Sequence, residues 1–203
     1  MKYFTLILLM FSVIGCAPVV FLGGSAAATK TATQEKSVGS SVDDFSIWMR
    51  IKGALFKQNN NYSATVSSKV EEGRVLLTGT VENQEQRLDV LKIVWSQKGV
   101  KEVINELVTK DEQDGISRGN YAKDSWITTQ IKSKLFFNNN VKSVNYNVET
   151  IAGIVYLIGI AQDEQELDIV TNVAGSIKNV QRVVSYVRIK DSEIRQEMLK
   201  KIQ

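Results

Sequence analysis

The residues that could do chemistry in this sequence are one cysteine, two groups of carboxylates, and a cluster of aromatic and basic residues. The chain contains no histidine and a single cysteine, Cys16. Without histidine there is no Ser-His-Asp or Cys-His nucleophile, no imidazole proton shuttle and no histidine-ligated zinc or haem. One cysteine forms neither an intramolecular disulfide nor a cysteine-rich metal site. What remains is lipid attachment, carboxylate chemistry and binding.

The carboxylates favour a structural role over catalysis. Paired carboxylates can do acid–base work, and acidic residues gather at positions 82–85 and 163–166. Both segments lie where helices are expected to begin. Asn83 and Asp163 have the character of N-caps, and Gln86 and Glu166, three residues later, complete capping boxes. Negative charge at a helix start is stabilised by the dipole and the free amides. We therefore expect no catalytic residue, no metal site and no cofactor.

Cys16 has the context of a lipid-attachment site. Lys2 precedes an almost wholly apolar stretch, residues 4–14, which ends at Gly15. A membrane span needs about 20 apolar residues, so this shorter stretch predicts a signal peptide over residues 1–15. The sequence of residues 13–16, Val-Ile-Gly-Cys, resembles the bacterial lipobox, in which the cysteine thiol carries diacylglycerol and acyl chains such as palmitate. The alternative is a plain secretory peptide in which Cys16 has no role.

The rest of the chain divides into a tether and a globular body. Residues 17–42 are rich in Gly, Ser, Ala and Thr, so we expect a flexible tether over residues 16–42. Of 203 residues, 43% are hydrophobic and 23% charged, which is enough apolar mass for one or two domains. The net charge of +3 suits an anionic surface without requiring nucleic acid, and no nucleic-acid partner is expected.

The body is a tandem repeat with an offset of 80 residues. Without a gap, this offset aligns Asp44 with Asp124, and it aligns the Val-x-Leu-x-Gly segment at 75–79 with the one at 155–159. Each copy predicts a helix, a hairpin turning at Gly73 or Gly153, a capped second helix and a closing strand. The expected strands cover 65–70, 74–81 and 101–109, then 145–150, 154–160 and 181–190.

The predicted fold is therefore α+β: two αββαβ units, each a three-stranded mixed sheet with both helices on one face. The expected boundaries are 43–110 for the first unit, 111–123 for a linker and 124–190 for the second unit. Residues 191–203 carry Ile194, Met198 and Ile202 at four-residue spacing, which predicts a short terminal helix.

The first helix of the second unit carries the main candidate binding surface. Ile127, Ile131 and Leu135 form a buried stripe on a helical wheel, and this arrangement turns Trp126 and Phe137 outward together. Amphipathic rings prefer the lipid headgroup boundary, and nearby lysines attract an anionic surface. The basic residues around the rings are Lys123, Lys132 and Lys134. The alternative is that Trp126 packs against the first unit or against the linker between the units.

The first unit is not expected to bind in the same way. It has Ser46 where the second unit has Trp126, and Lys57 where the second has Phe137. The other two tryptophans, Trp48 and Trp95, are expected to be packing residues.

A glycine turn, Val-x-Leu-x-Gly, a capped helix and a valine-rich closing strand together resemble the BON domain of bacterial envelope proteins. The whole layout of residues 1–190 is similar to dual-BON outer-membrane lipoproteins. That resemblance rests on the lipobox, the tether, residues 37–44 (SVGSSVDD) and residues 124–129 (DSWITT).

The resemblance implies a non-enzymatic protein on the periplasmic face of the outer membrane, which binds anionic phospholipid of the phosphatidylglycerol kind and preserves outer-membrane integrity. Ala17, which is not the aspartate that retains some lipoproteins at the inner membrane, agrees with this location. The alternative function is an adaptor or stabiliser of the outer-membrane assembly machinery that uses the same aromatic face.

Overall fold

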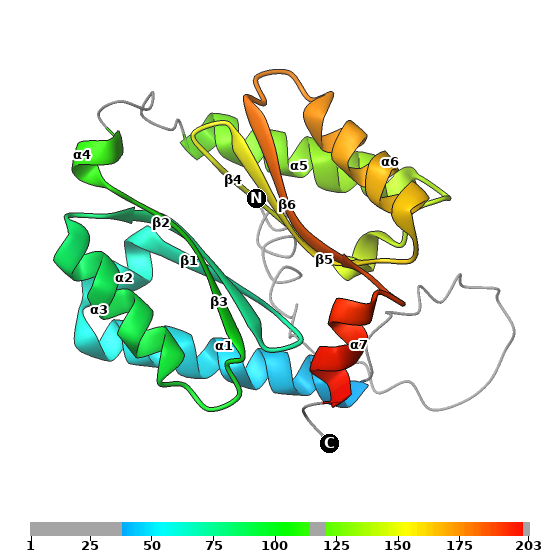
Figure 1. Ribbon diagram of the computed structural model, residues 1–203. Coiled ribbons are helices and arrows are strands. Elements are labelled where there is room, and N and C mark those ends of the chain that lie inside the picture. Colours follow the sequence, from blue (N-terminus) through cyan, green and yellow to red (C-terminus); the bar gives the residue numbers. More distant parts are fainter. Residues whose placement is uncertain (1–37, 114–120, 201–203) are drawn as a thin grey trace, which may run out of the picture. The chain divides into compact units, whose positions relative to one another are not determined.

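Figure 1 shows the computed structural model of the chain, which describes residues 38–113 and 121–200. All of these residues belong to one compact unit, Ala32–Gln203. The predicted signal peptide, Cys16 and most of the predicted tether lie outside the described residues.

The first repeat has the predicted order of helix, hairpin, helix and strand. Its two main helices are α1 (Val38–Gln58) and α3 (Gln84–Trp95), and its strands are β1 (Val66–Glu71), β2 (Arg74–Val81) and β3 (Glu102–Thr109). In the sheet, β2 lies in the middle, antiparallel to β1 and parallel to β3. Two short helices, α2 (Asn60–Thr65) and α4 (Lys110–Gln113), were not predicted.

The second repeat has the same topology. Its main helices are α5 (Tyr121–Phe137) and α6 (Glu164–Gly175), and its strands are β4 (Tyr146–Ile151), β5 (Ile154–Ala161) and β6 (Arg182–Ile189). The central β5 is antiparallel to β4 and parallel to β6. A 3-10 turn, η1 (Ser143–Asn145), precedes β4, and α7 (Glu193–Lys200) follows β6. The predicted α+β fold of two mixed three-stranded sheets is confirmed.

Helix ends differ from the sequence-based boundaries at two places. Helix α1 begins at Val38, inside the segment predicted as tether, and α5 begins at Tyr121, inside the predicted linker. Once a helix is held by its packed face, adding a turn at its N-terminus gains one hydrogen bond per residue. Apolar periodicity marks only the packed part of a helix, so it does not detect such an extension.

Both main helices of each repeat cover the same face of its sheet. In the first repeat Ile47, Ile51 and Leu55 form the buried side of α1. They pack with Val75 and Leu77 of β2 and with Val90 of α3. The second repeat builds the equivalent core from the α5 stripe, Val155, Leu157 and Val170. Neighbouring strand residues point to opposite faces, so Leu76, Tyr156 and Ile158 point away from the helices.

The sheet faces that point away from the helices pack against each other. Leu76 and Ile104 of the first sheet form one buried apolar cluster with Tyr156 and Ile158 of the second. Polar contacts join the rim of this interface. Arg74 donates to the Tyr186 carbonyl oxygen at 2.9 Å, and Arg188 and Glu102 form an ion pair at 2.8 Å. The two repeats are therefore bound back to back through their sheets, with their helices on the outer faces.

Asp44 and Asp124, the first residues of the repeat to align, hold the hairpin turns. The Asp124 carboxylate accepts the backbone N–H groups of Ala152 at 2.8 Å and of Gly153 at 2.9 Å. Asp44 does the same for the first hairpin turn. Both central residues of each turn have positive φ, as a tight hairpin of the mirror-image type requires. A charge-assisted bond to each amide compensates the strain of a non-glycine residue there.

Candidate functional site

Helix α5 presents its aromatic rings to solvent, as its wheel predicted. Ile127, Ile131 and Leu135 are almost fully buried against the sheet. Trp126 is 46% exposed and Phe137 is 78% exposed. At this exposure Trp126 is not buried against the first repeat.

Two further rings on α5 were missed by the sequence analysis. Phe136 is 70% exposed and Tyr121 is 87% exposed. The Phe136 and Phe137 rings meet edge to face with centroids 5.2 Å apart, so Phe137 contacts Phe136. The helical wheel also predicts that Phe136 is exposed. Phe136 and Trp126 each lie about 140° from the centre of the buried stripe, in opposite directions around the helix.

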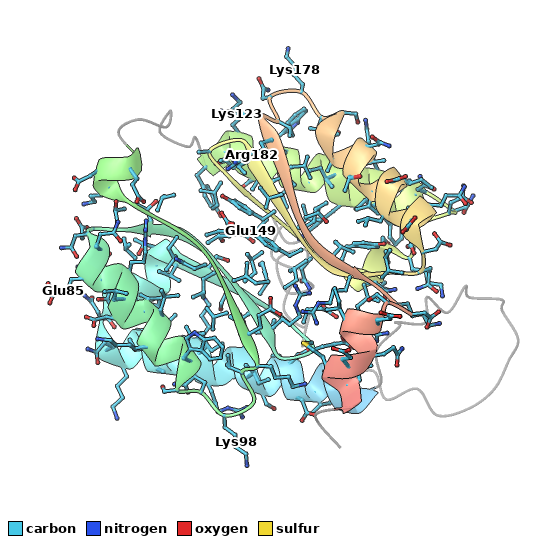
Figure 2. All side chains as sticks on the ribbon, viewed as in Figure 1. Glu85, Lys98, Lys123, Glu149, Lys178 and Arg182 are labelled. Carbon is cyan, nitrogen blue, oxygen red and sulfur yellow. The ribbon has the colours of Figure 1, made fainter. Side chains whose placement is uncertain are left out.

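The three predicted lysines are all exposed, but they do not lie together. Lys134 and Phe137 line one shallow hollow with residues 138–140 after the helix. Lys132 lies on the opposite flank of α5, where it lines a hollow with Phe136. Lys123 lies near the start of α5 (Figure 2). The rings therefore run along the outward side of the helix, with basic residues on both flanks.

The exposed charge of α5 is entirely basic. Asp124 is the one acidic residue of the helix, and it is 7% exposed because its carboxylate is committed to the hairpin turn. Every charge that α5 presents to solvent is thus a lysine ammonium. A helix with outward rings and only positive charge around them suits a surface that is both apolar and anionic.

A cleft of about 600 Å³ lies beside α5, between the two repeats. Its walls carry hydroxyl groups, among them Thr128 and Thr150, which share a hydrogen bond of 2.8 Å. Lys132 and its repeat counterpart Lys52 line it from either side. Lys52 donates to the Val66 carbonyl at 3.1 Å, and burial, with Lys69 nearby, lowers the pKa of its ammonium.

Two of the carboxylates near the helix starts, Asp163 and Glu166, form a helix cap. Asp163 accepts the Glu166 N–H at 2.8 Å, while the Glu166 carboxylate accepts the Gln162 N–H at 2.7 Å. Asn83 and Gln86 make the equivalent pair of bonds at the start of α3. The predicted capping boxes are confirmed. Across residues 38–113 and 121–200, no group of three or more candidate metal ligands lies close together.

Comparison with known proteins identifies the repeat. Residues 43–111 and 123–191 each match the BON domain. The chain belongs to the BON family. We call the two repeats BON domain 1 and BON domain 2.

Three relatives extend this match over most of the chain. A protein of Anaplasma centrale named for the gshII 5′ region is 42% identical over 76% of this chain and 99% of its own length. The outer membrane lipoprotein DolP of Haemophilus influenzae is 33% identical over 85% of this chain and 89% of its own length. The osmotically-inducible protein Y of Escherichia coli is 31% identical over 81% of each chain. The chain is a dual-BON protein of the DolP type.

The first helices of the two BON domains differ as predicted at the two ring positions. In BON domain 1, Ser46 is half-buried and Lys57 is exposed. Trp48 is half-buried against the core, as expected. Trp95, also expected to pack, is instead 53% exposed, because it is the last residue of α3 and lies beyond the buried Val94.

Within the described part of the chain, no helix combines the length and the apolar character that crossing a bilayer requires.

Proposed function

We propose that the protein is a lipid-anchored BON protein of the bacterial envelope that docks on anionic phospholipid through α5 of BON domain 2. The observation that carries this proposal is the pairing of outward aromatic rings with exposed charge that is only basic. Trp126 and Phe137 insert at the headgroup boundary, and Lys123, Lys132 and Lys134 attract the anionic surface. No residue is assigned a catalytic role; of the clustered carboxylates, Asp163 and Glu166 are committed to a helix cap.

The expected strength of this docking is modest. Each lysine near an anionic membrane contributes about 1 kcal/mol, so three contribute about 3 kcal/mol. Full burial of a phenylalanine side chain contributes about 1.5–3 kcal/mol, and Phe137 is already 78% exposed and available for burial. A surface of this kind orients a protein that is already held at the membrane better than it recruits one from solution.

The second part of the proposal is the anchor. Acylation at Cys16 would supply the durable attachment, since two or more acyl chains hold a protein to a bilayer. One relative at 33% identity is an outer membrane lipoprotein, which supports the periplasmic face of the outer membrane as the location and maintenance of that membrane as the role. Mass spectrometry of the mature protein tests the anchor. An acylated Cys16 at the new N-terminus is the expected result, and an unmodified cysteine would refute it.

Vesicle flotation tests the docking surface. Residues 32–203 form a compact unit and contain no cysteine, so this fragment reports docking without the anchor. At the high lipid concentration that a modest affinity requires, we expect it to float with vesicles containing phosphatidylglycerol, less with rising salt, and not with pure phosphatidylcholine. Trp126→Ala should abolish most of the flotation. Trp95→Ala is the matched control, because Trp95 has a similar exposure, 53% against 46%, on another helix.

The adaptor function is the other outcome of the same experiment. If the fragment floats with neither vesicle type, or if Trp95→Ala and Trp126→Ala lose flotation equally, α5 is not a lipid-docking helix. The exposed rings would then mark a protein interface, because exposed apolar patches of this kind also serve protein partners such as an outer-membrane assembly machine.

A further inference from the structure

Helix α1 of BON domain 1 carries an exposed apolar stripe of its own. Val42, Phe45, Met49 and Phe56 are 59%, 62%, 51% and 58% exposed. Their spacings of three, four and seven residues place all four on one side of the helix. That side lies opposite the stripe that packs on the sheet, so α1 is apolar on two sides.

This stripe was missed because it does not fall on the positions that carry the rings in α5. The repeat counterparts of Trp126 and Phe137 are Ser46 and Lys57, so comparison of the two repeats predicts only that the units do not bind in the same way. The exposed residues of α1 lie one position away from these, at Phe45 and Phe56. The Phe45 ring contacts the half-buried Trp48, with centroids 5.9 Å apart.

Basic residues flank the α1 stripe as well. Arg50 and Lys57 are exposed in the second half of the helix. Arg50 also donates to the Lys98 carbonyl at 2.7 Å, which leaves its positive charge in place. Of the two acidic residues, Asp44 is 5% exposed and holds the hairpin turn, so Asp43 alone opposes the basic residues.

We propose that the α1 stripe is a second docking surface, and that its occupant is the anionic bilayer that holds the protein's own lipid anchor. Because α1 and α5 lie on opposite outer faces of the two packed sheets, the protein docks through one helix or the other, in two alternative orientations. This inference rests on the proposed anchor at Cys16. From Val42 to Phe56 the stripe runs for about 21 Å along the helix, at 1.5 Å per residue. A straight apolar stripe with basic flanks has the form of a helix that lies in the membrane interface.

The length of chain between anchor and helix favours this occupant over a soluble partner. Residues 17–37 separate Cys16 from the start of α1 at Val38. Fully extended, these residues reach about 70 Å at most. A tether of this length holds α1 near the bilayer at an effective concentration on the order of millimolar. An affinity that binds a free protein only at high lipid concentration is therefore sufficient to dock α1 there, and the same high lipid concentration makes docking measurable in an unanchored fragment.

Site-specific fluorescent labels test the proposal. The cysteine-free fragment 32–203 accepts one environment-sensitive label at a time, through Met49→Cys on α1, Trp126→Cys on α5 or Leu88→Cys on α3. Leu88 is the matched control, since it is 54% exposed on a helix with no proposed docking role. With phosphatidylglycerol vesicles, we expect blue shifts at positions 49 and 126 and none at position 88.

The outcomes separate this inference from the proposed function. A shift at 126 without one at 49 overturns the α1 surface and leaves α5 docking intact. A shift at 49 without one at 126 supports α1 and overturns the α5 proposal. No shift at either position overturns both. A shift at 49 that needs no vesicles and grows with protein concentration overturns the bilayer as occupant, because it identifies a second copy of the chain.

Removing the stripe gives a second measurement. The triple variant Phe45→Ser, Met49→Ser, Phe56→Ser alters exposed side chains only, so its circular dichroism should match that of the parent. In the Trp126→Ala background, which leaves α1 as the main docking surface, we expect the triple variant to lower partition onto phosphatidylglycerol vesicles about tenfold or more, where tenfold corresponds to about 1.4 kcal/mol. Unchanged partition would overturn the proposal, and Leu88→Ser should leave partition unchanged.

Discussion

Removing one partner of the buried ion pair between Arg195 and Glu72 should destabilise the protein more than removing one partner of an exposed pair between the two BON domains. Arg195, on α7 after BON domain 2, donates to the two carboxylate oxygens of Glu72 in BON domain 1 at 3.0 and 2.8 Å. It also donates to the Lys190 carbonyl. The side chains of the pair are 7% and 6% exposed. Arg195→Met retains the apolar stem but leaves the Glu72 carboxylate buried without its partner.

Breaking a buried pair from one side costs about 3–5 kcal/mol, because the remaining charge is neither hydrated nor compensated. The matched control is Lys69→Met. Lys69 and Glu149 also join the two domains, at 3.0 Å, but their side chains are 34% and 21% exposed (Figure 2 labels Glu149). Water screens such a pair, so its loss should cost about 0–1 kcal/mol. The two variants remove similar contacts that differ in burial.

Urea unfolding of residues 32–203, followed by tryptophan fluorescence, measures both losses. Trp48 and Trp95 report BON domain 1, and Trp126 reports BON domain 2. If α7 detaches in Arg195→Met, Glu72 becomes hydrated, and the loss in the free energy of unfolding is limited to the docking free energy of α7. The α7 amides would then exchange quickly with deuterium. A loss no larger than that of Lys69→Met, with the α7 amides still protected, would refute the reasoning.

Three further predictions concern single positions. Gly159→Ala would place a Cβ atom 2.1 Å from a backbone oxygen at η1, so we expect the free energy of unfolding, measured by thermal unfolding, to fall by about 1–3 kcal/mol. At Gly53 an added Cβ meets no atom within 4 Å, so Gly53→Ala should raise the free energy of unfolding by about 0.5–1 kcal/mol. Similar effects of the two variants would contradict the steric argument. Asp124→Ala removes both acceptors of the β4–β5 turn, so the two turn amides should exchange faster with deuterium, and unchanged exchange would exclude the turn-holding role. Burial, with Glu106 nearby, raises the pKa of Tyr156 to about 12, above the ordinary 10.0. The folded state therefore holds this proton to higher pH than the unfolded state, and the free energy of unfolding should fall as pH rises from 10 to 12. This fall should be smaller in Tyr156→Phe, and an equal fall in the variant would assign it to other groups.

Local patterns in the sequence were sufficient for the elements of the fold and for most of the α5 surface. The repeat, the hairpin turns and the capping residues all depend on interactions within a few positions along the chain. The same holds for the exposure of Trp126 and Phe137, because the three buried residues of α5 fix which side of that helix faces outward. Helical spacing alone also predicts the exposed α1 stripe. Alignment with the rings of α5 does not, because the exposed residues of α1 lie one position away from the aligned ones.

The C-terminal tail illustrates what such patterns cannot determine. Its apolar spacing correctly predicted a helix, but Ile194 is 66% exposed while Arg195 is 6% exposed. A buried arginine depends on a carboxylate placed beside it by a chain segment more than a hundred residues away. Nothing near Arg195 in the sequence identifies Glu72 as that partner.

The sequence by itself determined two BON domains, their helices and strands, and one outward aromatic face, since each follows from periodicity along a single element. The tertiary structure decided how the domains join. The run of apolar residues in β5 indicates a strand buried on both faces but does not name what covers the second face. That face is covered by Leu76 and Ile104, and the pairing depends on the shape and charge of two whole surfaces that meet only after each domain has folded.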